Sequence, residues 1–312
     1  MTEELRIGGV RVERSAPATQ STDNHRPPLL LVHGGSHGSW CWANYLSCFS
    51  DAGWDTLALN WYGHGGSEDL APEALVNRSI CDVTEEIGLV AATLPRPPVV
   101  VGHSMGGLAA QVYAERNEVA GLVLIASVVP EEVGGPVNEI PVDFSAPFPV
   151  LPFEVAWHMF FEGVPEADAR ELYALLVPES PRAVWEASRW TVSVDRSRIS
   201  CPVLVIGGEI DMLCPAEITR NLAAHYDAEY IQVPGRGHSI MLEPRWRETA
   251  DQIADWLGRL KAPAESLSRN AGRDQRRAAA RRGANRSRSK IHSASTPSRQ
   301  VSFFPASRDR AL

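Results

Sequence analysis

Residues 99–107, which read VVVGHSMGG, constrain the fold of this chain more than any other stretch. Three β-branched residues lead directly into a Gly-x-Ser-x-Gly pattern, and a run of helix-forming residues follows at 108–115. This order predicts a strand, a turn one residue wide and a helix, with Ser104 at the turn. Gly102 and Gly106 supply the small neighbours that such a strained turn requires. The context predicts a nucleophile elbow rather than an incidental serine in a glycine-rich turn.

Short apolar runs recur on both sides of this turn, and helical patterns alternate with them. The apolar runs lie at 29–32, 55–60, 121–126, 202–208 and 229–233, and the helical patterns at 40–52, 73–94, 216–226 and 245–260. Wholly apolar strands separated by helices are typical of a parallel sheet covered on both faces. We therefore predict an α/β fold with a mostly parallel, doubly wound sheet, formed by residues 1–130 and 199–261. Residues 5–14 alternate in polarity around a Gly-Gly pair and predict an edge strand or hairpin.

Residues 131–198 interrupt this alternation. Six prolines fall within 130–152, and helical, aromatic-rich segments follow at 153–161, 167–176 and 183–190. We predict a helical lid with an apolar underside, inserted over the carboxyl ends of the strands, where open α/β sheets bind ligands. A packed structural subdomain is the alternative interpretation.

The last part of the chain, residues 262–312, has a different composition. Residues 263–312 hold 12 Lys and Arg against 3 Asp and Glu, a charge of +9, whereas 18 basic and 35 acidic residues give 1–262 a charge of −17. A basic segment with almost no apolar pattern cannot offset its ordering entropy, so we expect a disordered tail. Contact with nucleic acid or an anionic membrane is an alternative, but the tail has no structured motif and no interleaved aromatic residues to support it.

Cysteine usage and the first residues favour a reduced, cytoplasmic protein. The five cysteines form no C-x-x-C pair, and no His/Cys cluster has zinc spacing, so we predict no metal and no cofactor. The charged start, MTEELR, predicts no signal peptide, and no apolar run is long enough to span a membrane.

A serine nucleophile needs a base within hydrogen-bond reach and an acid that orients the base. Among the nine histidines, only His238 combines a late loop position with a preceding strand and glycine-rich flanks. Three others, His33, His37 and His103, flank glycines near the expected site and are interpreted as groups that hold loops. His238 is therefore the predicted base.

Asp211 is the predicted acid, because it lies on the loop after the strand at 202–208 and precedes the histidine in the order Ser, Asp, His. The alternatives are Glu209 on the same loop, and Glu131 and Glu132 after the strand at 121–126.

The oxyanion that forms during acyl transfer needs two N–H donors. We predict the amides of Met105, which follows the nucleophile, and Gly35, in the glycine-rich loop after the first buried strand. Ser36 is the alternative to Gly35.

These motifs resemble the α/β-hydrolase superfamily over about residues 27–261. The run 33–42, HGGSHGSWCW, resembles the H-G-x-x-H-G-x-W of the plant methylesterase and hydroxynitrile lyase branch. HSIMLEP at 238–244 is similar to that branch's H-x-x-M-L-x-x-P but one residue shorter before the proline. The turn at 63–67 and the elbow are similar to the wider esterase and lysophospholipase-like set. The resemblance implies hydrolysis through an acyl-enzyme without metal or cofactor, with Ser104 as nucleophile, His238 as base, Asp211 as acid, and Gly35 and Met105 as oxyanion donors.

Departures from the family patterns narrow the chemistry. Dehalogenases and epoxide hydrolases of this fold use an aspartate nucleophile. The serine at position 104 excludes the reactions of these two enzyme classes. Hydroxynitrile lyases carry a lysine where this chain has Ser239, which argues against cyanohydrin cleavage. Asn60 replaces the aspartate that often opens the D-x-x-G-H-G turn, so we expect this loop to be held differently.

The expected function is hydrolysis of a small or medium carboxylic ester, with a small-molecule ester as the partner. Perhydrolysis, or hydrolysis of a lactone, a thioester or a C–C bond, would use the same triad. A non-catalytic ligand receptor on this fold is the alternative from a different class, since fold does not determine function.

Overall fold

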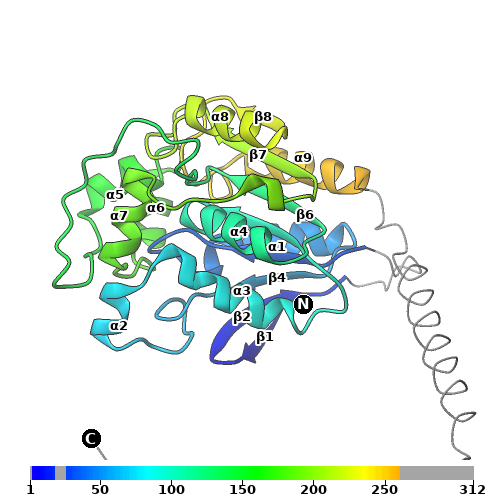
Figure 1. The fold of residues 1–312 in the computed structure, drawn as a ribbon, viewed down its shortest axis with the longest axis horizontal. Helices are drawn as coiled ribbons and strands as arrows, with labels where there is room; N and C mark the ends of the chain where they lie inside the picture. Colours follow the sequence, from blue (N-terminus) through cyan, green and yellow to red (C-terminus); the bar gives the residue numbers. More distant parts are fainter. Residues whose placement is uncertain (1, 18–25, 261–312) are drawn as a thin grey trace, which may run out of the picture. The chain divides into compact units, whose positions relative to one another are not determined.

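The computed structural model describes residues 2–17 and 26–260, so the basic tail lies outside the described residues. An eight-stranded sheet has the order β1-β2-β4-β3-β5-β6-β7-β8 (Figure 1). Its strands are β1 (Thr2–Ile7), β2 (Val10–Ser15), β3 (Leu29–Val32), β4 (Thr56–Leu59), β5 (Val99–His103), β6 (Gly121–Ile125), β7 (Val203–Gly208) and β8 (Glu229–Val233). All neighbours from β4 to β8 are parallel, which confirms the predicted fold class.

The strand order places two important loops side by side. β3 pairs with β5 in a register that sets Val32 opposite Gly102, so the loop after Val32 and the turn after His103 leave the same edge of the sheet. The chain runs from β3 to β4, which lies on one side of β3. A second crossover connection then takes it from β4 to β5, which lies on the other side of β3. Such a reversal opens a crevice at the carboxyl ends of the strands, where ligands bind in this class of fold.

The N-terminal strands form a hairpin at the edge of the sheet. β1 and β2 are antiparallel and β2 pairs antiparallel with β4. The turn consists of Gly8 and Gly9, with φ of 56° and 84°, a region that glycine enters without steric cost. Of the two arrangements expected for residues 5–14, the chain adopts the hairpin.

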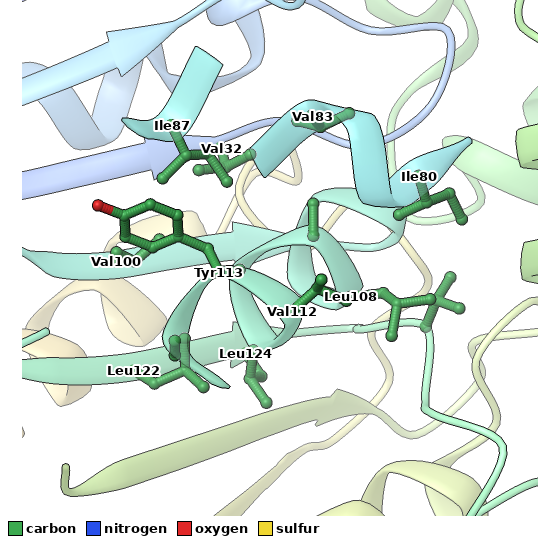
Figure 2. Packing of buried hydrophobic residues seen from close by; sticks show 14 of the residues in the cluster. Val32, Ile80, Val83, Ile87, Val100, Leu108, Val112, Tyr113, Leu122 and Leu124 are labelled. Atoms are coloured by element: carbon green, nitrogen blue, oxygen red, sulfur yellow. The ribbon is translucent and has the colours of Figure 1, made fainter. Parts of the chain in front are cut away.

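Helices cover both faces of the sheet and each face has its own apolar core. One core joins the sheet to α3 (Thr84–Ala91), α4 (Met105–Arg116) and α8 (Ala216–Tyr226), and the other joins it to α1 (Ala43–Asp51) and α9 (Trp246–Arg259). Figure 2 shows Leu108, Val112 and Tyr113 of α4 packed between strand residues and the neighbouring helical segment. Every residue of β3 to β7 is buried and most of them are apolar, as expected for strands that are covered on both faces.

The helix predicted over 73–94 is broken, and this prediction was wrong. The structure has α2 (Pro72–Asn77), a 3₁₀ turn η2 (Ile80–Val83) and α3 in its place. Ser79 forms a capping box: its hydroxyl accepts the N–H of Cys81, and its own N–H donates to the Asp82 carboxylate. These bonds start a new helical segment at Ser79 and leave the chain at Arg78 extended.

Between β6 and β7 the chain leaves the sheet and forms α5 (Phe153–Phe160), α6 (Glu166–Tyr173) and α7 (Pro181–Arg189). These helices gather at the left of Figure 1, and a short 3₁₀ turn, η3 (Arg196–Arg198), precedes β7. A separate apolar cluster, which includes Ala156, Phe161 and Ala169, holds the first two helices together. Within the described ranges, no helix is both long and apolar enough to cross a membrane.

Candidate active site

Ser104 occupies the turn between β5 and α4, with φ 53° and ψ −124°. A non-glycine residue pays a steric penalty for positive φ, so the surrounding chain must hold this conformation. There is no room for larger neighbours: a Cβ at Gly102 would lie 2.5 Å from the Gly106 carbonyl oxygen, and one at Gly106 would lie 2.1 Å from that of His33. The half-buried Ser104 lines the apolar cavity described below, and the N-terminus of α4 lies directly behind it.

Asp211 and His238 meet in a buried pair on the loops after β7 and β8. His238 Nδ1 lies 3.1 Å and 3.0 Å from the two carboxylate oxygens of Asp211. Asp211 Oδ1 also accepts the backbone N–H groups of Leu213 and Cys214, at 2.9 Å and 3.0 Å. The carboxylate is therefore held by its own loop, and it sets the tautomer of the histidine with Nε2 as the free acceptor.

The other acids that the sequence left open lie elsewhere. Glu209 accepts the N–H of Gly235 at 2.7 Å on an exposed surface, and Glu132 binds Ser193 and the N–H of Val194. Glu131 is exposed on the loop after β6. None of the three hydrogen-bonds to His238 in the described part of the chain.

His103 connects the elbow to the loop that carries His238. His103 Nε2 lies 3.1 Å from the carbonyl oxygen of His238, and the two rings are 4.8 Å apart. Burial, followed by the charge of His238, lowers the pKa of His103 well below its ordinary value, so this histidine stays neutral. Among the hydrogen bonds of the described residues, none joins the Ser104 hydroxyl to His238.

The loop after β3 is held by histidine side chains. His33 Nδ1 lies 2.8 Å from the Gly34 carbonyl oxygen, and its Nε2 accepts the N–H of Trp61 at 3.1 Å. His37 Nδ1 lies 2.7 Å from the Gly35 carbonyl oxygen, and burial lowers the pKa of His37 to about 4. Both histidines are therefore neutral and donate through Nδ1.

Two backbone N–H groups near Ser104, those of Gly35 and Met105, find no acceptor among the residues that the structure describes. The two residues are close neighbours, because a Cβ at Gly35 would lie 2.6 Å from the Met105 sulfur. The N–H of Ser36, the alternative to Gly35, is occupied by the carboxylate of Glu179 at 2.8 Å.

An apolar cavity of about 270 Å³ lies between the elbow and the helices inserted after β6. Gly35, Ser104 and Met105 line one side of it. The rest of the wall is largely apolar and includes Val128, Ile140, Leu151, Met159, Phe160 and Leu213. Such a cavity accepts an apolar group and presents it to the serine hydroxyl.

Asp211, Cys214 and His238 are the described residues that could together hold a metal ion, with ligand atoms within 4.8 Å of one another. Burial, and then the charge of Asp211, raises the pKa of the Cys214 thiol well above its ordinary value. A thiol must lose its proton to bind zinc, and Asp211 already accepts hydrogen bonds from His238 and two amides. The set fits a hydrogen-bonded acid–base pair better than a metal site.

A serine on a strand–turn–helix elbow, in a mostly parallel eight-stranded sheet with a buried Asp–His pair at the carboxyl ends of its strands, is typical of the α/β-hydrolase class. The model of the alpha/beta hydrolase family matches residues 29–252, and the chain belongs to this family.

Similarity to individual proteins varies in extent. Protein phosphatase methylesterase 1 of Bos taurus is 36% identical over 103 residues, which cover 31% of this chain and 26% of that protein. Monoacylglycerol lipase of Mycolicibacterium smegmatis is 26% identical over 283 residues, covering 80% of this chain and 94% of the lipase. The enol-lactonase of Burkholderia xenovorans superposes with a TM-score of 0.62 at 19% identity, covering 82% of this chain and all of that one, and shares the fold.

Proposed function

We propose that this chain is a serine hydrolase that cleaves small or medium, uncharged carboxylic esters through an acyl-enzyme. The observation that carries the proposal is the strained Ser104 at the wall of an apolar cavity, on the sheet edge that also holds the Asp211–His238 pair. The names of the similar proteins, a methylesterase and a monoacylglycerol lipase, support ester chemistry in this family.

The first half-reaction forms the acyl-enzyme. Ser104 Oγ attacks the ester carbonyl carbon while His238 Nε2 takes the hydroxyl proton, and Asp211 stabilises the imidazolium. The carbonyl oxygen becomes an anion, and the unpartnered N–H groups of Gly35 and Met105 donate to it. When the tetrahedral intermediate collapses, the C–O bond of the leaving group breaks, and His238 returns the proton to the departing alcohol.

The second half-reaction reverses these roles with water as the nucleophile. His238 Nε2 takes a proton from water, the hydroxide adds to the acyl carbon, and the same two amides hold the oxyanion. Collapse breaks the bond to Ser104, whose oxygen regains the proton, and the carboxylic acid leaves.

The cavity supports an uncharged substrate group of limited size. Its volume of about 270 Å³ is close to the lower end of the range of roughly 300–1,000 Å³ that is typical of small-molecule pockets. Glu179 is a buried carboxylate in the wall, but its charge is matched by His64, as described below. An apolar wall of this kind disfavours a charged acyl chain, because the charge would lose its hydration without gaining a partner.

The decisive experiment combines covalent labelling with turnover. We expect a fluorophosphonate probe to label the wild-type chain and Ser47→Ala, which removes a hydroxyl on α1, but not Ser104→Ala. We also expect Ser104→Ala to lower kcat for p-nitrophenyl esters by a factor of about 10³ or more, as removal of a triad member does. Turnover should be greatest for short to medium acyl chains. Undiminished turnover by Ser104→Ala would disprove the proposed nucleophile.

A further inference from the structure

Glu179 is a buried charge in a place where the sheet and the inserted helices meet. It lies between α6 and α7, is 1% exposed and lines the cavity beside Gly35 and Ser36. Its Oε1 accepts the N–H of Ser180 at 2.7 Å, and its Oε2 accepts the N–H of Ser36 at 2.8 Å. Burying a carboxylate costs free energy because the carboxylate loses its hydration. Hydrogen bonds and an opposite charge must compensate for that loss.

His64 supplies the opposite charge. Its Nε2 lies 3.1 Å from Glu179 Oε2, and its Nδ1 lies 3.1 Å from the carbonyl oxygen of Tyr62. Both ring nitrogens therefore face acceptors, and both must carry a proton, which makes the ring an imidazolium. Burial alone would lower the pKa of His64, but the charge and hydrogen bonds of Glu179 outweigh burial and raise it.

The Ser36 peptide held by Glu179 is strained. Ser36 has φ 60°, the left-handed region that serine rarely adopts. Its N–H donates to Glu179, and its carbonyl oxygen accepts the N–H of Val177 at 3.1 Å. Residues 177–179 therefore bind both the N–H and the carbonyl oxygen of Ser36. Rotation of the peptide between Gly35 and Ser36 would relieve the strain, and glycine at position 35 makes that rotation easy.

We infer that Glu179 is a positioning residue of the oxyanion hole: with its charge balanced by His64, its carboxylate holds Ser36 in the left-handed conformation that leaves the Gly35 N–H free beside Ser104. Without this bond, the His37 contact to the Gly35 carbonyl oxygen is left to hold the peptide alone. We expect the peptide then to rotate, so that the Gly35 carbonyl oxygen turns toward the cavity and its negative dipole faces the developing oxyanion. The inference rests on the proposed function, in which Gly35 is an oxyanion donor.

The test uses Glu179→Gln. Both carboxylate oxygens accept hydrogen bonds, so either orientation of the amide sets an NH₂ donor against another donor. Loss of one oxyanion donor costs a factor of ~10²–10³ in kcat, and displacement costs less, so we expect kcat to fall about 10- to 100-fold. KM should change by less than a factor of about three, because the apolar wall is untouched.

A trifluoromethyl ketone gives a readout that a merely structural role would not change. Ser104 Oγ adds to its carbonyl carbon, His238 takes the proton, and the ketone oxygen becomes an anion in the hole. We expect the inhibition constant of Glu179→Gln to rise by the same factor as kcat falls, because both depend on the oxyanion donors.

Glu186→Gln is the matched control. Glu186 of α7 is also buried and also ties the inserted helices to the core, accepting the Ser79 hydroxyl and the N–H of Ile80 at 2.8 Å each. It does not line the cavity, so kcat and the inhibition constant should stay within twofold of wild type. An equal loss in this control would overturn the inference, as would wild-type values in Glu179→Gln.

Glu179→Asp decides the question if the glutamine variant does not fold. It keeps the charge that His64 needs but is one methylene too short to hold both His64 and Ser36, so the same loss of kcat is expected, and unchanged kcat would overturn the inference. Fluorophosphonate labelling is measured first on the wild type and on Ser104→Ala. If the wild type is not labelled, the proposed function fails; if labelling is as expected and the Glu179 variants behave as wild type, only this inference fails.

Discussion

Gly106 lies where the elbow meets the loop after β3, and backbone atoms already fill the space that a side chain would need. A Cβ there would lie 2.1 Å from the His33 carbonyl oxygen and 2.6 Å from that of Val32. Neither atom can move without displacing the end of β3. The glycine is therefore required by the close approach of two chain segments, one of which carries Ser104 and the other Gly35.

We predict that Gly106→Ala lowers the free energy of unfolding by about 1–3 kcal/mol, the range for overpacking, and also lowers esterase activity. Gly258→Ala in α9 is the control, because a Cβ there meets nothing within 4 Å. It should be neutral or raise stability by up to about 1 kcal/mol through helix propensity. Urea unfolding of both variants checks the prediction, which equal stabilities would contradict.

At the scale of elements, the segment between α2 and α3 links the core to the inserted helices. The Ser79 hydroxyl accepts the N–H of Cys81 and donates to Glu186 of α7 at 2.8 Å. The N–H of Ile80 also donates to Glu186. One short turn therefore starts the next helical segment and anchors α7.

We expect Ser79→Ala to lower the free energy of unfolding by about 1–2 kcal/mol, because it removes a cap and one hydrogen bond to a buried carboxylate. Activity at saturating substrate should remain close to wild type, since Ser79 does not line the cavity. Chemical denaturation and kcat, measured beside the exposed Ser47→Ala, test this. A loss of activity without a loss of stability would show that the turn acts on the site directly.

At the scale of the whole molecule, the His64–Glu179 pair couples folding to pH. The His64 pKa is raised from 6.5, since the charge of Glu179 outweighs burial. The stabilisation that protonated His64 gives to the folded state is fully present below pH 6.5, and it is lost as pH rises through the raised pKa. The Glu179 pKa is lowered from 4.5, because His64 and the backbone N–H groups outweigh burial, so its contribution is present above pH 4.5 and is lost as pH falls through the lowered pKa.

The wild-type chain should therefore lose stability relative to Glu179→Gln as pH rises above 6.5. Free energies of unfolding from urea titrations at a series of pH values give the comparison. If the free energies of unfolding of the two proteins change equally with pH above 6.5, His64 carries no proton in the folded state.

Much of the fold can be predicted because its signals are local. The apolar runs identify the strands, and the glycines around Ser104 require a tight turn whatever lies around them. Even the break in the predicted helix at 73–94 has a local signal in Ser79-x-x-Asp82, which the longer apolar periodicity concealed. The identity of Ser104, Asp211 and His238 as candidates likewise follows from chain order and from the loops on which they lie.

Contacts between distant segments had no such signal. Nothing near Glu179 indicates that it meets Ser36, 143 residues away, or His64, 115 residues away. Asp211 was the predicted acid and Glu209 the alternative on the same loop. The folded loops bring Asp211 to His238, while Glu209 binds the N–H of Gly235. A short motif determines the conformation of its own backbone. The partner of a buried charge depends instead on how the sheet and the inserted helices pack together.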